Sequence, residues 1–174
     1  MTHGDTILEG MLSAAATYVS RMPDNGFCLS LLGKPGTGKT MLARAIFEHA
    51  RKYYKYYANE RLYGVTASRE IYFRTAQDIN RYIFDRQREQ LKYMEDAFLL
   101  VIDDLGTGFD KSGYALSEME HLIDRRLGKY TVITSNMDLE GIADALDPRI
   151  ASRLARDNNI VVGCETADYA MRQN

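Results

Sequence analysis

Cysteine, proline and long apolar runs are all scarce in this sequence. Its two cysteines, Cys28 and Cys164, have no CxxC partner and no histidine at metal-ligand spacing, which argues against a metal site and favours two buried thiols. The three prolines, 45% hydrophobic and 26% charged residues suit an ordinary globular chain. No run approaches the roughly 20 apolar residues of a membrane span, and no apolar segment behind basic residues opens the chain. We therefore expect a cytoplasmic protein that does not insert into membranes.

Net charge is small as well. The 22 basic and 24 acidic side chains leave a formal net charge of −2 and a pI near 5.9, which argues against a protein whose whole surface binds nucleic acid. A local basic stripe remains compatible with this balance. The 174 residues match the length of one domain, with an N-terminal helix and turn expected over 1–26 and an α/β core over 27–174.

Glycine is concentrated in one motif, GKPGTGKT at 33–40, which follows an apolar run and precedes a helical pattern. Its glycines permit backbone conformations that a Cβ would forbid. Successive N–H groups can then point at phosphate oxygens while the next helix offers its positive end. The motif predicts a nucleotide-binding loop, in which Lys39 bridges the β- and γ-phosphates and the Thr40 hydroxyl binds Mg²⁺. The residues expected to contact the nucleotide are Gly33, Lys34, Pro35, Gly36, Thr37, Gly38, Lys39, Thr40 and Met41.

Two carboxylates end the apolar run AFLLVIDD at 97–104. A continuous apolar run is typical of a strand buried on both faces in a parallel sheet, and its carboxyl end lies where such sheets bind ligands. We expect Asp103 to hold Mg²⁺, and Asp104 to orient or deprotonate the water that attacks the γ-phosphate. The alternative is that two aspartates simply terminate a strand.

A second β-branched run, YTVITSN at 130–136, ends in polar residues. In a parallel sheet its end lies beside Asp103, so Asn136 is expected to reach the γ-phosphate or the attacking water. Asn136 could also cap the helical segment that follows. Further on, DPRIASRLAR at 147–156 supplies arginines, and a guanidinium suits the charge on a transferring phosphoryl group.

Strand-like and helix-like patterns alternate along the whole chain. Strands are expected at 27–32, 71–73, 97–104, 130–136 and 160–163. Helices are expected at 6–22, 40–57, 77–93, 114–127 and 138–146. This alternation predicts the α/β class, with a three-layer parallel sheet and crossover helices. We find no internal repeat or linker.

Two segments mix basic residues with helical patterns. At 51–61, tyrosines interleave with basic residues and could stack on single-stranded nucleic acid, although amphipathic cover over the sheet is the favoured interpretation. This segment contains Arg51, Lys52, Tyr53, Tyr54, Lys55, Tyr56, Tyr57 and Arg61. The polar side of the 77–93 helix carries Arg81, Arg86, Arg88 and Lys92. Such charged faces are usually only solvated.

With the phosphate loop, IDD, TSN and DPRIASRL in this order, the chain resembles the AAA+ ATPases of the initiator and loader branch. More narrowly, it is similar to the ATPase domain of bacterial replicative helicase loaders of the DnaC type and to the related IstB-type transposition ATPases. The resemblance covers 18–172, and LLVIDDLG, LIDRRL, ITSN and DYAMR are its more specific parts. Asp104 stands where most AAA+ proteins carry Glu.

The resemblance implies a P-loop core with strand order 5-1-4-3-2, without a helical lid, and ATP with Mg²⁺ as ligands. It places Lys39 and Thr40 in Walker A, Asp103 and Asp104 in Walker B, and Asn136 at sensor 1. It makes Arg153 the arginine finger that acts on the neighbouring subunit's ATP, with Arg149 as a helper. It also makes the 77–93 helix the extra element that lines a path for single-stranded DNA, contacted through Arg81, Arg86, Arg88 and Lys92.

The expected function is therefore an ATP-dependent replication factor that self-assembles on single-stranded DNA and helps to load a replicative helicase. The loaders grip the helicase with an amino-terminal domain, whereas only 26 residues precede the first expected strand. This chain is either a fragment or meets its partner differently. Three alternatives remain. They are a transposition ATPase acting on duplex DNA, a module that binds nucleotide without hydrolysis, and a small-molecule kinase, for which the segment after Asn136 leaves little room.

Overall fold

Five parallel strands form the centre of the molecule in the computed structural model, which describes residues 3–22, 26–60, 70–108, 113–156 and 158–164. The strands are β1 (Cys28–Leu32), β2 (Ile71–Thr75), β3 (Leu99–Leu105), β4 (Tyr130–Ser135) and β5 (Ile160–Gly163). They pair in the order β2-β3-β4-β1-β5, and every pairing is parallel. The predicted class and strand order are confirmed.

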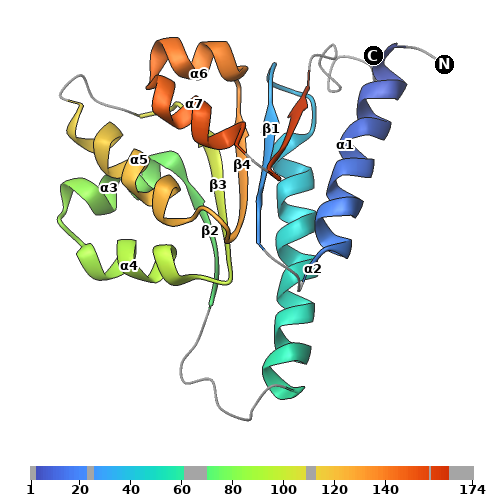
Figure 1. The fold of residues 1–174 in the computed structure, drawn as a ribbon, viewed down its shortest axis with the longest axis horizontal. Helices are drawn as coiled ribbons and strands as arrows, with labels where there is room; N and C mark the ends of the chain where they lie inside the picture. The colour runs from blue at the N-terminus through green and yellow to red at the C-terminus, as the bar shows by residue number, and fades with distance from the viewer. Residues whose placement is uncertain (1–2, 23–25, 61–69, 109–112, 157, 165–174) are drawn as a thin grey trace.

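Helices cover both faces of this sheet (Figure 1). One side carries α1 (His3–Ser20) and α2 (Lys39–Glu60). The other side carries α3 (Ala76–Phe84), α4 (Arg88–Asp96), α5 (Tyr114–Arg125), α6 (Leu139–Ala145) and α7 (Pro148–Leu154). Within the described ranges, every helix is too short or too polar to cross a bilayer.

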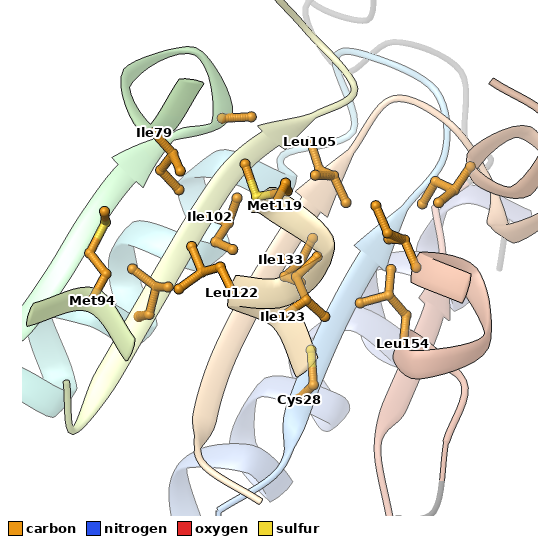
Figure 2. Close-up of a cluster of buried hydrophobic side chains, with 14 of the residues drawn as sticks. Cys28, Ile79, Met94, Ile102, Leu105, Met119, Leu122, Ile123, Ile133 and Leu154 are labelled. Atoms are coloured by element: carbon orange, nitrogen blue, oxygen red, sulfur yellow. The ribbon is translucent and has the colours of Figure 1, made fainter. Parts of the chain in front are cut away.

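The core consists of two apolar layers, because side chains alternate between the two faces of each strand. Leu29 and Leu31 of β1 pack with α1 and α2, whereas Cys28 and Leu32 pack in the layer beneath the other helices. Figure 2 shows this second layer, where Ile102 and Ile133 lie next to residues of α5. Both cysteines are buried and unpaired, as predicted.

The single helix predicted over 77–93 is wrong, because the chain forms α3 and α4 with a turn between them. Arg86 sits at the turn with φ of 54°, a left-handed conformation that ends a helix. A continuous helix of that length would extend about 25 Å, whereas a five-residue strand spans only about 17 Å. The break folds the segment back, so that Ile83 of α3 and Met94 of α4 enter the same core.

Other helix and strand ends differ from the prediction by a few residues. Helix α2 continues to Glu60, beyond its expected end at 57. Of the mixed aromatic and basic segment at 51–61, only the Arg51 and Lys52 side chains belong to the described part, and both are exposed. The remaining side chains of that segment, and the DYAMR motif at 168–172, lie outside the described residues.

Candidate nucleotide-binding site

The predicted phosphate loop connects the carboxyl end of β1 to the start of α2. Three of its glycines adopt positive φ angles, 125° at Gly33, 75° at Gly36 and 90° at Gly38, where a side chain would be strained. A Cβ at Gly33 would in addition lie 2.5 Å from the carbonyl oxygen of Cys164, which follows β5. The loop is therefore shaped by its own glycines and by its close approach to the neighbouring chain segment.

Lys39 occupies the centre of this loop. Its ammonium donates hydrogen bonds to the carbonyl oxygens of Gly33 and Lys34, both at 2.6 Å, and lies 3.4 Å from the Thr37 hydroxyl. The side chain is buried, and burial lowers the pKa of Lys39 while Cys164, Asp104 and Asp103 oppose the shift. A positive charge is thus held inside a ring of backbone at the amino end of a 22-residue helix, a place that favours an anion.

Thr40, Asp103 and Thr134 form a hydrogen-bond network beside the loop. One carboxylate oxygen of Asp103, Oδ1, accepts from the Thr40 hydroxyl at 2.9 Å and from the Thr134 hydroxyl at 2.6 Å. These three side chains come from α2, β3 and β4. The two predicted metal ligands, Thr40 and Asp103, are therefore in direct contact. The pairing of β3 with β4 adds Thr134, which was not predicted from the sequence.

Asp104 adopts an unusual backbone conformation next to this network. Its φ is 60°, and the register between β3 and β4 shifts between Ile102 and Leu105, which marks a β-bulge. The Asp104 N–H donates to the Thr134 hydroxyl at 2.9 Å, and its carboxylate accepts from the Asn136 side-chain amide at 2.9 Å. The bulge thus turns Asp104 toward Asn136 at the ends of two neighbouring strands.

The alternative role of Asn136 as a helix cap is wrong. Asp138 is the N-cap of α6, and its carboxylate accepts from the Gly141 N–H at 2.7 Å. The Asn136 side chain instead contacts Asp104. It is therefore available for a role in the site.

The oxygen donors at this site fit magnesium. Mg²⁺ prefers oxygen ligands and is usually bound by one or two protein groups together with phosphates and water. Among the described residues, no group of three or more His, Cys, Asp or Glu side chains could hold a metal ion. The Thr40 hydroxyl and the Asp103 carboxylate, 2.9 Å apart, match the smaller protein contribution that a nucleotide-bound Mg²⁺ needs.

The two arginines expected to act in trans lie together on α7 and are ion-paired within the chain. Arg153 lies 2.6 Å from an Asp124 oxygen and 3.1 Å from an oxygen of Glu120. Arg149 lies 3.2 Å from the other Glu120 oxygen and pairs with Asp147, whose pKa it lowers. Sequence reasoning missed Glu120. The available signal was an acidic residue at an inward position of the 114–127 helix.

Three of the four residues predicted to contact DNA meet at one groove between α4 and α5. Arg86, Arg88 and Lys92 line a hollow of about 770 Å³, whereas Arg81 of α3 is exposed and outside its lining. The remaining lining residues are Ile83, Leu91, Glu95, Tyr114, Glu118, His121 and Arg125. The α5 lining residues were not predicted, because the packing of α5 beside α4 has no local signal in the sequence. Its charged lining residues are four basic and two acidic side chains, and Arg125 pairs with Glu95 at 3.6 Å. The groove therefore carries a small basic excess, with the tyrosine ring of Tyr114 in its wall.

Comparison with known protein families finds a match over most of the chain. Residues 29–160 match the model of the ATPase family associated with various cellular activities (AAA). This match includes the phosphate loop, Asp103, Asp104, Asn136 and the arginines of α7. No match was found among curated protein sequences.

Solved structures with the same fold include proteins of replication. The chain is similar to the crystal structure of the DnaC helicase loader, with 23% identity and a TM-score of 0.68, covering 90% of this chain and 89% of that one. It is also similar to DnaI, with 21% identity, a TM-score of 0.69 and coverages of 92% and 82%. The replication initiator DnaA bound to AMPPCP and single-stranded DNA gives 18% identity and a TM-score of 0.67. That match covers 89% of this chain but only 45% of the DnaA chain.

Proposed function

Since the chain belongs to the AAA family of ATPases, we propose that it is an assembly factor of the helicase-loader type, switched by ATP. In this proposal ATP and Mg²⁺ bind between two subunits, the subunits assemble on single-stranded DNA, and hydrolysis releases them. The observation that carries the proposal is the hydrogen-bonded set formed by Thr40, Asp103 and Thr134, with Asp104 and Asn136 alongside it. It places the two proposed Mg²⁺ ligands, Thr40 and Asp103, beside the two residues proposed to position water, Asp104 and Asn136.

The residues of the chain divide the work as follows. Lys39 and the loop N–H groups hold the phosphates, and the ammonium exchanges its present bonds to loop carbonyls for phosphate oxygens. Thr40 and Asp103 hold Mg²⁺, which neutralises phosphate charge when bound. Asp104 orients or deprotonates the attacking water, and the Asn136 amide fixes the direction of the Asp104 carboxylate.

Arg153 completes the site of the next subunit in this proposal, with Arg149 beside it. A guanidinium supplied in trans stabilises charge on the transferring phosphoryl group and commonly contributes a factor of about 10³ to 10⁵ in kcat. A lone subunit lacks this group at its own nucleotide. It should therefore hydrolyse ATP slowly.

The groove between α4 and α5 is proposed to take the single-stranded DNA. Arg86, Arg88 and Lys92 can neutralise phosphates, and Tyr114 offers a half-exposed ring on which a base can stack. The similar DnaA structure was solved with single-stranded DNA, and the similar DnaC chain is a helicase loader, which supports a loader role with a replicative helicase as client.

The deciding experiment measures the affinity for a labelled single-stranded oligonucleotide with and without ATP and Mg²⁺. ATP should tighten binding about tenfold, a typical coupling between two ligand sites, and Arg153→Ala should abolish that gain. The double variant Arg88→Ala with Lys92→Ala should weaken binding in both conditions, because it removes phosphate contacts. Arg21→Ala, an exposed arginine beside Phe27 on the other face of the sheet, serves as the matched control.

Other outcomes point to the alternatives. A preference for duplex over single-stranded DNA would favour a transposition ATPase. ATP-dependent assembly without phosphate release would indicate a module that binds nucleotide and does not hydrolyse it. Transfer of phosphate to a small metabolite would indicate a small-molecule kinase.

A further inference from the structure

Glu120 is a buried carboxylate that the nucleotide site does not explain. It lies on α5 with only 4% of its side chain exposed. Its two oxygens hold different arginines of α7, since Oε1 lies 3.1 Å from Arg153 Nη2 and Oε2 lies 3.2 Å from Arg149 Nη1. One carboxylate therefore joins the two guanidinium groups into a single unit.

A charge at this position costs stability that an apolar residue would not. The neighbouring inward residues of α5 are the apolar Met119, Leu122 and Ile123. The free-energy cost of removing a carboxylate from water is offset only by close, oppositely charged or hydrogen-bonding partners. Proteins in which well-packed hydrophobic residues replace a buried ion pair are often equally stable or more stable. Packing alone thus gives no reason for a glutamate here, whereas fixing two arginines does.

The other two partners of the arginines, Asp124 and Asp147, differ in how readily their ion pairs can break. Asp124, which Arg153 contacts through Nε, has 47% of its side chain exposed. An exposed ion pair is worth little and can be exchanged for a phosphate oxygen. Asp147 caps the first turn of α7 and also binds Arg149, so it fixes the start of the same helix. Glu120 is the buried partner common to both arginines.

We propose that Glu120 is a positioning residue for catalysis in trans: it holds Arg149 and Arg153 in one fixed arrangement so that they reach the neighbouring subunit's nucleotide together. The inference rests on the proposed function, because it needs a shared site. An arginine side chain loses considerable rotamer freedom when it is ordered, and Glu120 supplies this ordering before the subunits meet.

Glutamine is the informative replacement for Glu120. It keeps the shape of the side chain but has only one acceptor oxygen, and its amide nitrogen is a donor that cannot face a guanidinium. Glu120→Gln can therefore satisfy one of the two arginines and releases the other. Stimulation in trans should fall roughly ten- to a hundredfold, the range expected when catalytic groups lose their alignment.

A mixing experiment separates this role from a folding defect. Arg153→Ala subunits keep their nucleotide site but lack the finger, and Lys39→Ala subunits lack the nucleotide site but keep the finger. Mixing the two should restore ATP hydrolysis on single-stranded DNA. The double variant Lys39→Ala with Glu120→Gln should fail to restore it, whereas Arg153→Ala with Glu120→Gln, mixed with Lys39→Ala, should restore it.

The outcomes distinguish the two proposals. If the first mixture stays inactive, the shared site itself is wrong, and the role of Glu120 falls with it. If the first mixture is active and Glu120→Gln has no effect in either partner, the shared site stands and the positioning role is overturned. Higher activity with Glu120→Gln in the finger donor would mean that Glu120 restrains the arginines, which also overturns it.

Two further measurements test whether a loss of stimulation reflects general damage to the protein. Glu9→Gln, an exposed glutamate on α1 across the sheet, is the matched control and should behave as the unchanged protein. Glu120→Gln should bind labelled nucleotide with unchanged affinity, because the phosphate loop lies on other elements. An equal loss of nucleotide affinity and of stimulation would mean general damage and would contradict the specific role.

Discussion

At the scale of the residue, Thr134 determines how the two Walker B aspartates are presented. Its hydroxyl donates to Asp103 at 2.6 Å and accepts from the Asp104 N–H at 2.9 Å. The side chain is 2% exposed, so water does not easily replace these bonds. A single hydroxyl thus orients the carboxylate proposed to bind Mg²⁺ and holds the backbone of the residue proposed to position water.

Thr134→Val tests this directly, because valine has the same shape without the hydroxyl. The half-buried Asp104 N–H would lose its partner, which costs up to about 1–3 kcal/mol of unfolding free energy. We also expect nucleotide binding to need a several-fold higher Mg²⁺ concentration, since Asp103 loses its orientation. Denaturant unfolding and titration of Mg²⁺ with a fluorescent ATP analogue measure the two effects.

Thr134→Ser is the matched control for this variant, because it restores the hydroxyl. Its Mg²⁺ requirement should return close to that of the unchanged protein. If the valine variant binds nucleotide with the same Mg²⁺ requirement as the serine variant, Thr134 does not position Asp103.

At the scale of the element, Arg126 joins the end of α5 to the neighbouring strands. It is 2% exposed and donates to the carbonyl oxygens of Met94 at 2.8 Å, Ala97 at 3.0 Å and Tyr130, and to the Thr131 hydroxyl at 3.0 Å. Burial lowers the pKa of Arg126 to about 10, so the guanidinium remains charged at neutral pH. One side chain therefore satisfies the backbone where α4 leads into β3 and α5 leads into β4.

Arg126→Met should destabilise the protein by about 3 kcal/mol or more, because several buried carbonyl groups lose their donor together. The adjacent Arg125→Met is the control, since that side chain is 67% exposed and its loss should change stability by only about 0.5 kcal/mol. Chemical denaturation of both variants measures the difference. Equal stabilities would show that water replaces the guanidinium.

At the scale of the whole molecule, the proposed site is complete only between two copies of the chain. The phosphate loop and the Walker B aspartates lie at the ends of β1 and β3. Arg149 and Arg153 lie on α7, where they pair with Glu120 and Asp124 of α5 and with Asp147 at the start of α7. Arg149 in particular keeps 63% of its side chain exposed. The arginines proposed to act in trans are thus partly exposed, where a second subunit can contact them.

Hydrolysis per subunit should therefore rise with protein concentration. Over about a hundredfold range we expect an increase of tenfold or more, because trans stabilisation of the phosphoryl group is worth that much and more. Arg153→Ala should give a flat, low rate over the same range. Phosphate release measured at constant ATP and Mg²⁺ provides the comparison, and a constant rate for the unchanged protein would contradict a shared site.

Local patterns were enough to predict much of the fold and part of the site. The phosphate loop is contiguous in sequence, and the buried strand ending in Asp103 and Asp104 is recognisable because every residue before them is apolar. Alternating periodicities indicated the parallel sheet, and the resemblance implied its strand order. By contrast, the helix break at Arg86 left no clear signal, because the apolar spacing of α3 and α4 resembles one helix.

Short-range patterns in the sequence are sufficient to predict the α/β class, the phosphate loop and the apolar strands, because these features depend on neighbours a few residues apart. Which distant groups meet depends instead on how the chain folds. Thr134 reaches the Walker B aspartates across the pairing of β3 with β4, and Glu120 reaches Arg149 and Arg153 across the contact of α5 with α7. Contacts of this kind are set by strand register and helix packing, which bring together residues about 30 positions apart. No local pattern encodes them.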